Sequence, residues 1–107
     1  MVMKVIWSSL AKSRLKQVYE YYAEKVSVKV AKSITQSILD SIRLLRKNPQ
    51  LGKVEETPEG LETYRELRCL IEGDYKIVYR VMDMYDAIDL VTIFYTYRDP
   101  DKMLEED

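Results

Sequence analysis

The chain has 107 residues, of which 47% are hydrophobic and 33% are charged. This is the size of one folded domain, and the composition matches neither a disordered chain nor a membrane protein. There are 17 basic and 18 acidic residues and no histidine, which excludes Ser-His-Asp and Cys-His catalysis and removes the commonest zinc ligand. We therefore expect one domain over residues 1–107, with no metal and no cofactor.

Cellular location is indicated by three further features. Cys69 is the single cysteine, so no intramolecular disulfide is possible. No apolar run approaches the roughly 20 residues that span a bilayer. Met1 leads directly into a strand-like segment, without the apolar region and cleavage site of a signal peptide. We expect a reduced, cytoplasmic protein with no contact to a membrane.

The first half of the chain predicts a strand and then a helical hairpin. Residues 2–7 form a short apolar run that suits a strand. Ser8 or Ser9 is placed to cap a first helix, and Ser27 to cap a second one. Each helix is apolar on one face only, so the two are expected to be antiparallel with facing apolar stripes. These stripes are Ala11, Leu15, Val18 and Tyr22 in the first helix, and Ala31, Ile34, Ile38, Ile42 and Leu45 in the second.

A loop and three strands are predicted in the second half. Asn48 ends the second helix, because a residue before proline avoids the helical region. Residues 48–63 are then expected to form a surface loop, since they contain two prolines, two glycines and several acids. The predicted strands cover residues 64–71, 75–81 and 88–97, with turn clusters at 72–74 and 83–86.

Alternation assigns the side chains of each strand to two faces. In the middle strand, Lys76 and Arg80 fall on the face opposite Tyr75, Ile77 and Tyr79. The last strand is apolar on both faces, which is typical of a central strand. In the first strand Leu67, Cys69 and Ile71 oppose Arg68, and in the last strand Ile88, Leu90 and Phe94 oppose Val91, Ile93 and Tyr95.

The predicted fold class is α+β. An N-terminal strand and an antiparallel two-helix hairpin precede a three-stranded antiparallel meander, and the helices cover one face of a single sheet. The other face is expected to carry Lys76, Arg80 and Arg68. Residues 98–107 are expected to form a polar C-terminal tail.

This order of elements, with the residues at their junctions, resembles the RelE/ParE superfamily of bacterial toxins from type II toxin–antitoxin modules. The opening strand ends in an aromatic residue, and the likeness covers nearly the whole length of the chain. The segments that carry it are KNPQLG at residues 47–52, YREL at 64–67, GDYKIVYRV at 73–81 and YRDP at 97–100.

The resemblance implies one fold with two possible activities. RelE-like members cleave mRNA in the ribosomal A site, using basic residues of the sheet with a tyrosine or histidine near the C-terminus. ParE-like members lack that set and poison DNA gyrase. Both kinds are silenced by a cognate antitoxin, so a hetero-oligomer with an antitoxin is the expected assembly.

Transferred to this sequence, the RelE-like catalytic set is incomplete. Arg65 stands at a basic position early in the second strand, and Lys76 stands where the third strand has an arginine. Arg98 lies at or one residue beyond a basic position that ends the fourth strand, and Tyr97 is the alternative occupant. The C-terminal tyrosine has no clear match because Met103 falls near its place. The proton-transfer partner is therefore missing or is displaced to Tyr95 or Tyr97, and a tyrosine with a pKa near 10 is a weak base.

Structural roles compete with these functional roles. Arg65 suits a salt bridge with acids of the loop or a place under the helices. Lys76 and Arg80 suit a solvated strand face or a cross-strand pair with Glu66. As a target-binding surface, the candidates are Arg68, Lys76, Arg80 and Arg98.

The overall charge of the chain favours one of the two activities over the other. Proteins that grip nucleic acid usually carry a basic excess, whereas this chain has an isoelectric point near 5.6. We therefore favour a ParE-like toxin that inhibits DNA gyrase over a RelE-like, ribosome-dependent endoribonuclease acting on mRNA. A non-toxic relic that only binds its antitoxin is the third possibility.

Overall fold

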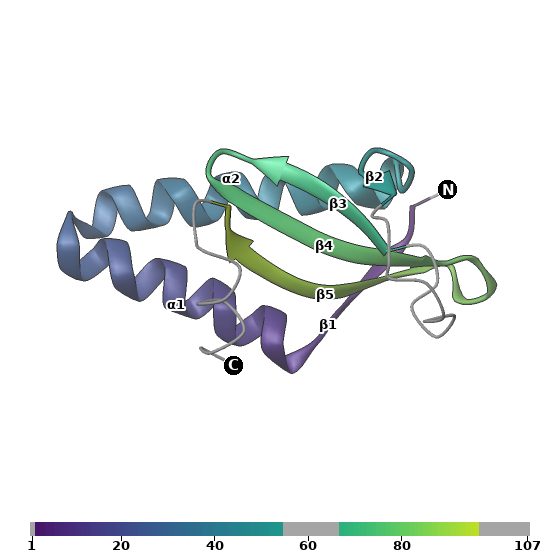
Figure 1. Ribbon diagram of the computed structural model, residues 1–107, viewed down its shortest axis with the longest axis horizontal. Helices are drawn as coiled ribbons and strands as arrows, with labels where there is room; N and C mark the ends of the chain where they lie inside the picture. The colour runs from purple at the N-terminus through teal and green to yellow at the C-terminus, as the bar shows by residue number, and fades with distance from the viewer. Residues whose placement is uncertain (1, 55–66, 97–107) are drawn as a thin grey trace.

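The computed structural model describes residues 2–54 and 67–96, and in this part of the chain two helices pack on one face of a five-stranded sheet (Figure 1). The helices meet at their connection, which projects beyond the strands, and they diverge toward their other ends. In chain order the elements are β1 (Lys4–Trp7), α1 (Ser9–Lys25), α2 (Val28–Lys47), β2 (Lys53–Val54), β3 (Leu67–Glu72), β4 (Tyr75–Met82), a 3-10 turn (Asp83–Tyr85) and β5 (Ala87–Tyr95).

The helix boundaries follow from local capping, as the sequence predicts. The Ser8 Oγ atom accepts a hydrogen bond from the backbone N–H of Ala11 at 2.9 Å, and the Ser27 Oγ atom accepts one from Val30 at 3.1 Å. Each serine thereby satisfies a backbone donor that the first helical turn leaves unpaired. Asn48 caps the C-terminal end of α2. Both predicted N-caps and the predicted end of the second helix are confirmed.

The strand order is β1-β5-β4-β3-β2. β1 pairs parallel to β5, and the β3–β4–β5 meander is antiparallel, so the predicted α+β class and the central place of the last strand are confirmed. The prediction that residues 48–63 hold only a loop is wrong, because β2 pairs with β3 at residues 53–54. A strand of two residues is too short to produce an alternating pattern.

A β-bulge at Val91 changes the faces of β5. Val78 lies opposite Thr92 whereas Tyr79 lies opposite Leu90, so Val91 is an extra residue in β5. One inserted residue shifts the alternation of all later side chains to the other face. The predicted grouping of the last strand is therefore wrong. Ile88, Leu90, Ile93 and Tyr95 pack with the helices, and Phe94 is on the open face.

The alternation of β3 is also opposite to the predicted orientation. Residues paired across neighbouring strands project on the same face, and Leu70 is paired with Ile77, a core residue. Leu70 packs against the core, and Glu72 accepts a hydrogen bond from Ser41 of α2. Leu67, Cys69 and Ile71 consequently lie on the open face of the sheet, away from the helices.

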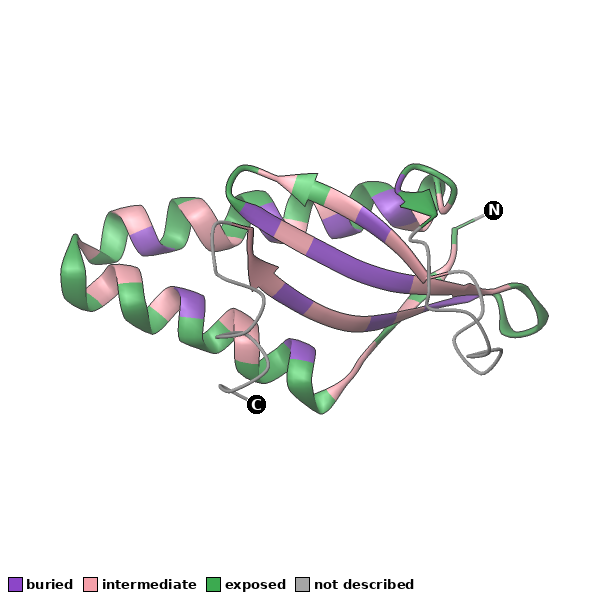
Figure 2. Cartoon of the chain, in the orientation of Figure 1, coloured by how far each residue is buried: buried purple, intermediate pink, exposed green. Residues whose placement is uncertain are grey.

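The hydrophobic core lies between the helices and the inner face of β4 and β5 (Figure 2). It explains the arrangement of the chain, because the apolar stripe of each helix is buried against these two strands. The open face of the sheet and the outer surface of the hairpin lie outside this core. The largest fully buried side chains are Tyr79, Ile38, Leu45, Ile77, Ile88, Leu90 and Ile93.

Candidate functional site

Two of the predicted site residues lie together on the open face of the sheet. Lys76 and Arg80 project from β4 on the side opposite Tyr75, Ile77 and Tyr79, which pack under the helices. This is the face that alternation predicts for them. Arg65, Tyr97 and Arg98 lie outside the residues that the structure describes.

Lys76 lies against an aromatic ring. It is paired in register with Phe94 of β5, and its Nζ atom is 5.7 Å from the centroid of the Phe94 ring. An ammonium group over a ring face is stabilised by the ring quadrupole, by about 0.5–1 kcal/mol at a site open to solvent. The bulge at Val91 creates this pair, because it moves Phe94 to the open face.

Arg80 is paired with an acid on the neighbouring strand. Its Nη2 atom is 3.6 Å from Oδ2 of Asp89, and both side chains are 31% exposed. The two residues are also directly opposite each other in the β4–β5 register. The carboxylate offsets much of the positive charge at this point. The alternation pattern pointed to Glu66 as an acid near Arg80, and Glu66 lies outside the described part of the chain.

Arg68 lies on the helix side of the sheet, so its predicted place beside Lys76 and Arg80 is wrong. Arg68 is paired with Tyr79, which is part of the core. Its guanidinium donates to the carbonyl of Gly52 at 2.8 Å and to the side chain of Gln50. The contacts hold the segment that follows α2. A role for Arg68 in target binding remains a prediction.

Tyr95 does not share a face with Lys76. Its ring packs on Tyr75, with ring centroids 5.6 Å apart and planes inclined at 59°, on the side of the helices. Tyr95 could accept a proton in catalysis only if it lay on the same face of the sheet as the basic residues, because both must contact one substrate. The bulge at Val91 separates them instead.

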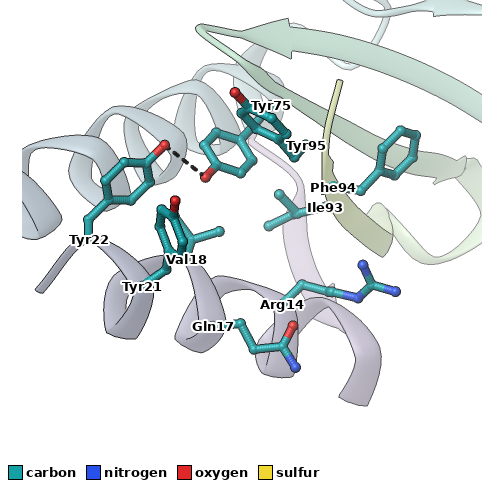
Figure 3. Close-up of a pocket in the computed structure, with 9 residues that line it drawn as sticks. All are labelled: Arg14, Gln17, Val18, Tyr21, Tyr22, Tyr75, Ile93, Phe94 and Tyr95. Atoms are coloured by element: carbon teal, nitrogen blue, oxygen red, sulfur yellow. Dashed lines mark hydrogen bonds between the residues drawn. The ribbon is translucent and has the colours of Figure 1, made fainter. Parts of the chain in front are cut away.

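A cleft of about 420 Å³ opens between α1 and the adjoining ends of β4 and β5 (Figure 3). Arg14 and Gln17 project from α1, and the hydroxyl of Tyr75 donates a hydrogen bond to that of Tyr22 at 3.3 Å. Sequence reasoning missed this cleft, because its walls come from segments that are distant in the chain. The lining residues are Arg14, Gln17, Val18, Tyr21, Tyr22, Tyr75, Ile93, Phe94 and Tyr95.

The tyrosines of the interior remain protonated at neutral pH. Burial raises the pKa of Tyr75 far above its ordinary value, and the hydrogen bond with Tyr22 adds to this shift. Burial also raises the pKa of Tyr79, although the hydrogen bond from Gly52 and the nearby Arg68 act in the opposite direction. Neither hydroxyl is therefore poised to accept a proton from a substrate.

Residues 2–54 and 67–96 show neither a metal-binding cluster nor a membrane-spanning helix. No group of three or more cysteine, aspartate or glutamate side chains is gathered there at spacings that suit a metal ion. No helix among these residues has both the length and the apolar character needed to span a bilayer. The open sheet face and the α1–β5 cleft both carry candidate binding residues.

One family model matches most of the chain. The family model described as the ParE toxin of the type II toxin–antitoxin system parDE matches residues 5–100. No curated protein matches by sequence.

Solved structures show the same fold. A chain of the chromosomal ParDE toxin–antitoxin system from P. aeruginosa aligns with a TM-score of 0.70 and 20% identity, over 88% of this chain and 96% of that one. A chain of the toxin–antitoxin complex RelBE2 from Mycobacterium tuberculosis aligns with a TM-score of 0.59 and 13% identity, over 89% and 99%. An arginine-substituted variant of E. coli RelE aligns with a TM-score of 0.52 and 10% identity, over 91% and 86%.

Proposed function

Because this chain belongs to the family of ParE toxins of type II toxin–antitoxin systems, we propose that it inhibits DNA gyrase and that a cognate antitoxin neutralises it. The observation that carries the proposal is the family match, which runs from β1 through both helices and the whole meander. The proposed target and partner would place the protein in the cytoplasm.

The chemistry of the open sheet face supports a binding role over a catalytic one. Lys76 rests on Phe94, and Arg80 is paired with Asp89. Tyr95 belongs to the opposite face. General acid–base catalysis requires a proton acceptor within hydrogen-bond reach of the reacting group. A cation on an open sheet face instead suits contact with a protein partner.

The direct test is a supercoiling assay with purified toxin and purified gyrase. We expect the toxin to abolish supercoiling and to generate linear DNA that appears only when gyrase is present. Lys76→Ala should weaken inhibition if the open face contacts gyrase, whereas Lys25→Ala, exposed in the last turn of α1 on the other side of the sheet, serves as the matched control. Undiminished supercoiling at toxin concentrations well above that of gyrase would contradict the proposal.

A second function, ribosome-dependent cleavage of mRNA, is favoured by the position of Lys76 alone. It lies on the open face, at the place where the resemblance puts a catalytic arginine. Toeprinting of translated mRNA would then reveal cuts in the A site, and these would disappear in Lys76→Ala. Intact message in the presence of active ribosomes would exclude this alternative.

We propose the α1–β5 cleft as the place where the antitoxin binds. β1 pairs with β5 only as far as Leu90, and the carbonyl of Val91 accepts a hydrogen bond from Ser8. The strand edge beside the cleft therefore begins at Thr92, and Tyr21 at the cleft is 57% exposed. An extended segment can add to a strand edge while an apolar side chain enters a neighbouring groove. Tyr21→Glu should weaken binding of the antitoxin measured by calorimetry, whereas Tyr85→Glu, far from the cleft on the 3-10 turn, should not.

Expression without the antitoxin separates a toxin from a relic. Growth arrest that co-expression of the antitoxin relieves is the expected result. Normal growth with soluble, folded protein would favour a protein that only binds its antitoxin.

A further inference from the structure

The overall charge of the chain conceals a strong segregation of charge. Residues 1–54 contain 11 of the 17 lysines and arginines but only 3 of the 18 acids. The strand half of the chain is correspondingly acidic. The near-neutral net charge of the whole chain therefore does not describe the electrostatic potential around the helical hairpin. The hairpin lies on one side of the sheet (Figure 1). Charge asymmetry of this kind is a signature of contact with a polyanion.

Four basic residues of α2 lie on one outer side of that helix. On α2, Lys29, Lys32, Arg43 and Lys47 are separated by 3, 11 and 4 positions, spacings that return to the same side of a helix. All four are exposed, and the buried residues of α2 lie on a different stripe. Asp40 interrupts this row and pairs with Arg43 at 3.2 Å.

The first helix adds two cations to the outer surface of the hairpin. Lys12 and Lys16 are one turn apart on α1 and are exposed. The two helices diverge from their connection toward the start of α1 and the end of α2 (Figure 1), and the exposed acids Glu20 and Glu24 follow the two lysines along α1. We call the six residues Lys12, Lys16, Lys29, Lys32, Arg43 and Lys47 the hairpin basic face.

Two properties of this face indicate which polyanion it fits. The positions between its cations include exposed Ser13, Ser33 and Gln36, and hydroxyl and amide side chains commonly bind phosphate oxygens. The exposed aromatic residue of α1, Tyr21, lines the α1–β5 cleft instead, and Tyr19, one turn from Lys16, is half-buried. No fully exposed ring therefore stands among these cations for an unpaired base to stack on.

The dimensions agree with a duplex. Helices of 17 and 20 residues are about 25 and 30 Å long, close to one turn of B-form DNA at about 34 Å. An acidic peptide helix would be expected to meet an apolar strip on the face that binds it. Along α2 the cations alternate with Ser33, Gln36 and Asp40 instead, and the exposed apolar residues beside them, Val28 and Leu44, are 16 positions apart.

We propose that the hairpin basic face binds the phosphate backbone of double-stranded DNA without sequence preference. Lysine and arginine on this face displace condensed counterions from the duplex, and the gain of counterion entropy drives association. This contact is separate from the open sheet face and does not depend on gyrase. It would hold the toxin beside DNA while the other surfaces remain available to protein partners.

The test is the salt dependence of binding to a fluorescein-labelled 24-base-pair duplex, measured by anisotropy in the absence of gyrase. Full-length toxin should bind with a dissociation constant between about 1 and 100 µM near physiological salt. The logarithm of the association constant should fall linearly with the logarithm of the salt concentration, by about 0.9 for each phosphate contact. A single strand of the same sequence and a duplex RNA should bind no more tightly.

Two variants, with four substitutions on this face and two away from it, localise the contact. Lys12→Gln, Lys16→Gln, Lys32→Gln and Lys47→Gln together should reduce the salt slope by about 3 to 4 and weaken binding at least tenfold. The control variant Lys4→Gln with Lys53→Gln removes charges from β1 and β2 and should leave the slope within about one of the wild type. Circular dichroism and the melting temperature should show both variants folded.

Three results would overturn the inference. The first is wild-type toxin that fails to bind the duplex at low salt. The second is a quadruple variant that binds as tightly as the control variant. The third is binding to a polyglutamate peptide but not to DNA, which would identify an acidic protein as the ligand. Because gyrase is absent from each measurement, these outcomes leave the test of gyrase inhibition unaffected.

Discussion

The phenol oxygen of Tyr79 accepts a hydrogen bond from the backbone N–H of Gly52 at 2.8 Å, across a sequence separation of 27 residues. The same hydroxyl donates to the carbonyl of Pro49 at 2.8 Å. Tyr79 is fully buried in the centre of the sheet. One core side chain thus provides hydrogen-bond partners for two backbone groups of the segment that leads from α2 to β2. Part of the resemblance to the toxin superfamily lies in this same segment.

Removal of this hydroxyl should destabilise the fold. Tyr79→Phe leaves the Gly52 donor and the Pro49 acceptor without their partner in a buried place, and such a loss costs about 1–3 kcal/mol. Urea unfolding followed by circular dichroism measures the change. Tyr21→Phe removes a hydroxyl from a side chain that is 57% exposed and should stay within about 0.5 kcal/mol of the wild type. Equal stability of the two variants would contradict the role assigned to Tyr79.

Gly52 should tolerate no side chain. A Cβ atom at this position would lie 2.7 Å from the Tyr79 hydroxyl and 2.8 Å from the carbonyl of Cys69. We expect Gly52→Ala to cost about 1–3 kcal/mol or more from overpacking. Gly73→Ala is the contrasting case, because open space surrounds Gly73 but its φ of +58° costs alanine about 1–2 kcal/mol.

Combining the two changes tests whether Gly52 and Tyr79 act on one contact. Gly52→Ala with Tyr79→Phe should cost less than the sum of the single variants, because the hydroxyl that meets the new Cβ is then absent. The stability of all four proteins should be measured in the same urea series. Strict additivity would mean that the alanine is accommodated elsewhere.

The bulge at Val91 predicts unequal effects for two neighbouring residues. Ile93 is fully buried under the helices, so Ile93→Ala should cost about 2–5 kcal/mol. Phe94 is half-buried on the open face, and Phe94→Ala should cost clearly less. If Phe94→Ala proved the more damaging change, the bulge would be misplaced.

Stability should decline in alkaline solution. Burial raises the pKa of the Tyr75 and Tyr79 hydroxyls above the ordinary 10.0. The folded state then retains protons that the unfolded chain loses, so the stability from these tyrosines is complete below pH 10 and is lost as pH rises toward their folded-state pKa values. Melting temperatures between pH 8 and pH 11 measure this loss. Absorbance at 295 nm should show a late-ionising fraction that shrinks in Tyr75→Phe and persists in Tyr85→Phe.

Structural features that depend only on residues close together in the chain could be predicted from the sequence. Ser8 and Ser27 start the helices and Asn48 ends the second one, because capping satisfies backbone groups within a single turn. The alternation of β4 correctly places Lys76 and Arg80 opposite Tyr79, since β4 is regular and its inner face is strongly apolar. The order of strands and helices, and with it the α+β class, follows from such local patterns.

Features that depend on pairing between distant segments were decided only by the tertiary structure. The bulge at Val91 arises from the β4–β5 register and moves Phe94 to Lys76 while Tyr95 goes to the helices. Arg68 faces the helices because Leu70 and Tyr79 set the orientation of β3. The α1–β5 cleft and the two-residue strand β2 likewise have no local signature. A change of register by one residue reverses every face at almost no cost to local propensity, so alternation alone could not assign them.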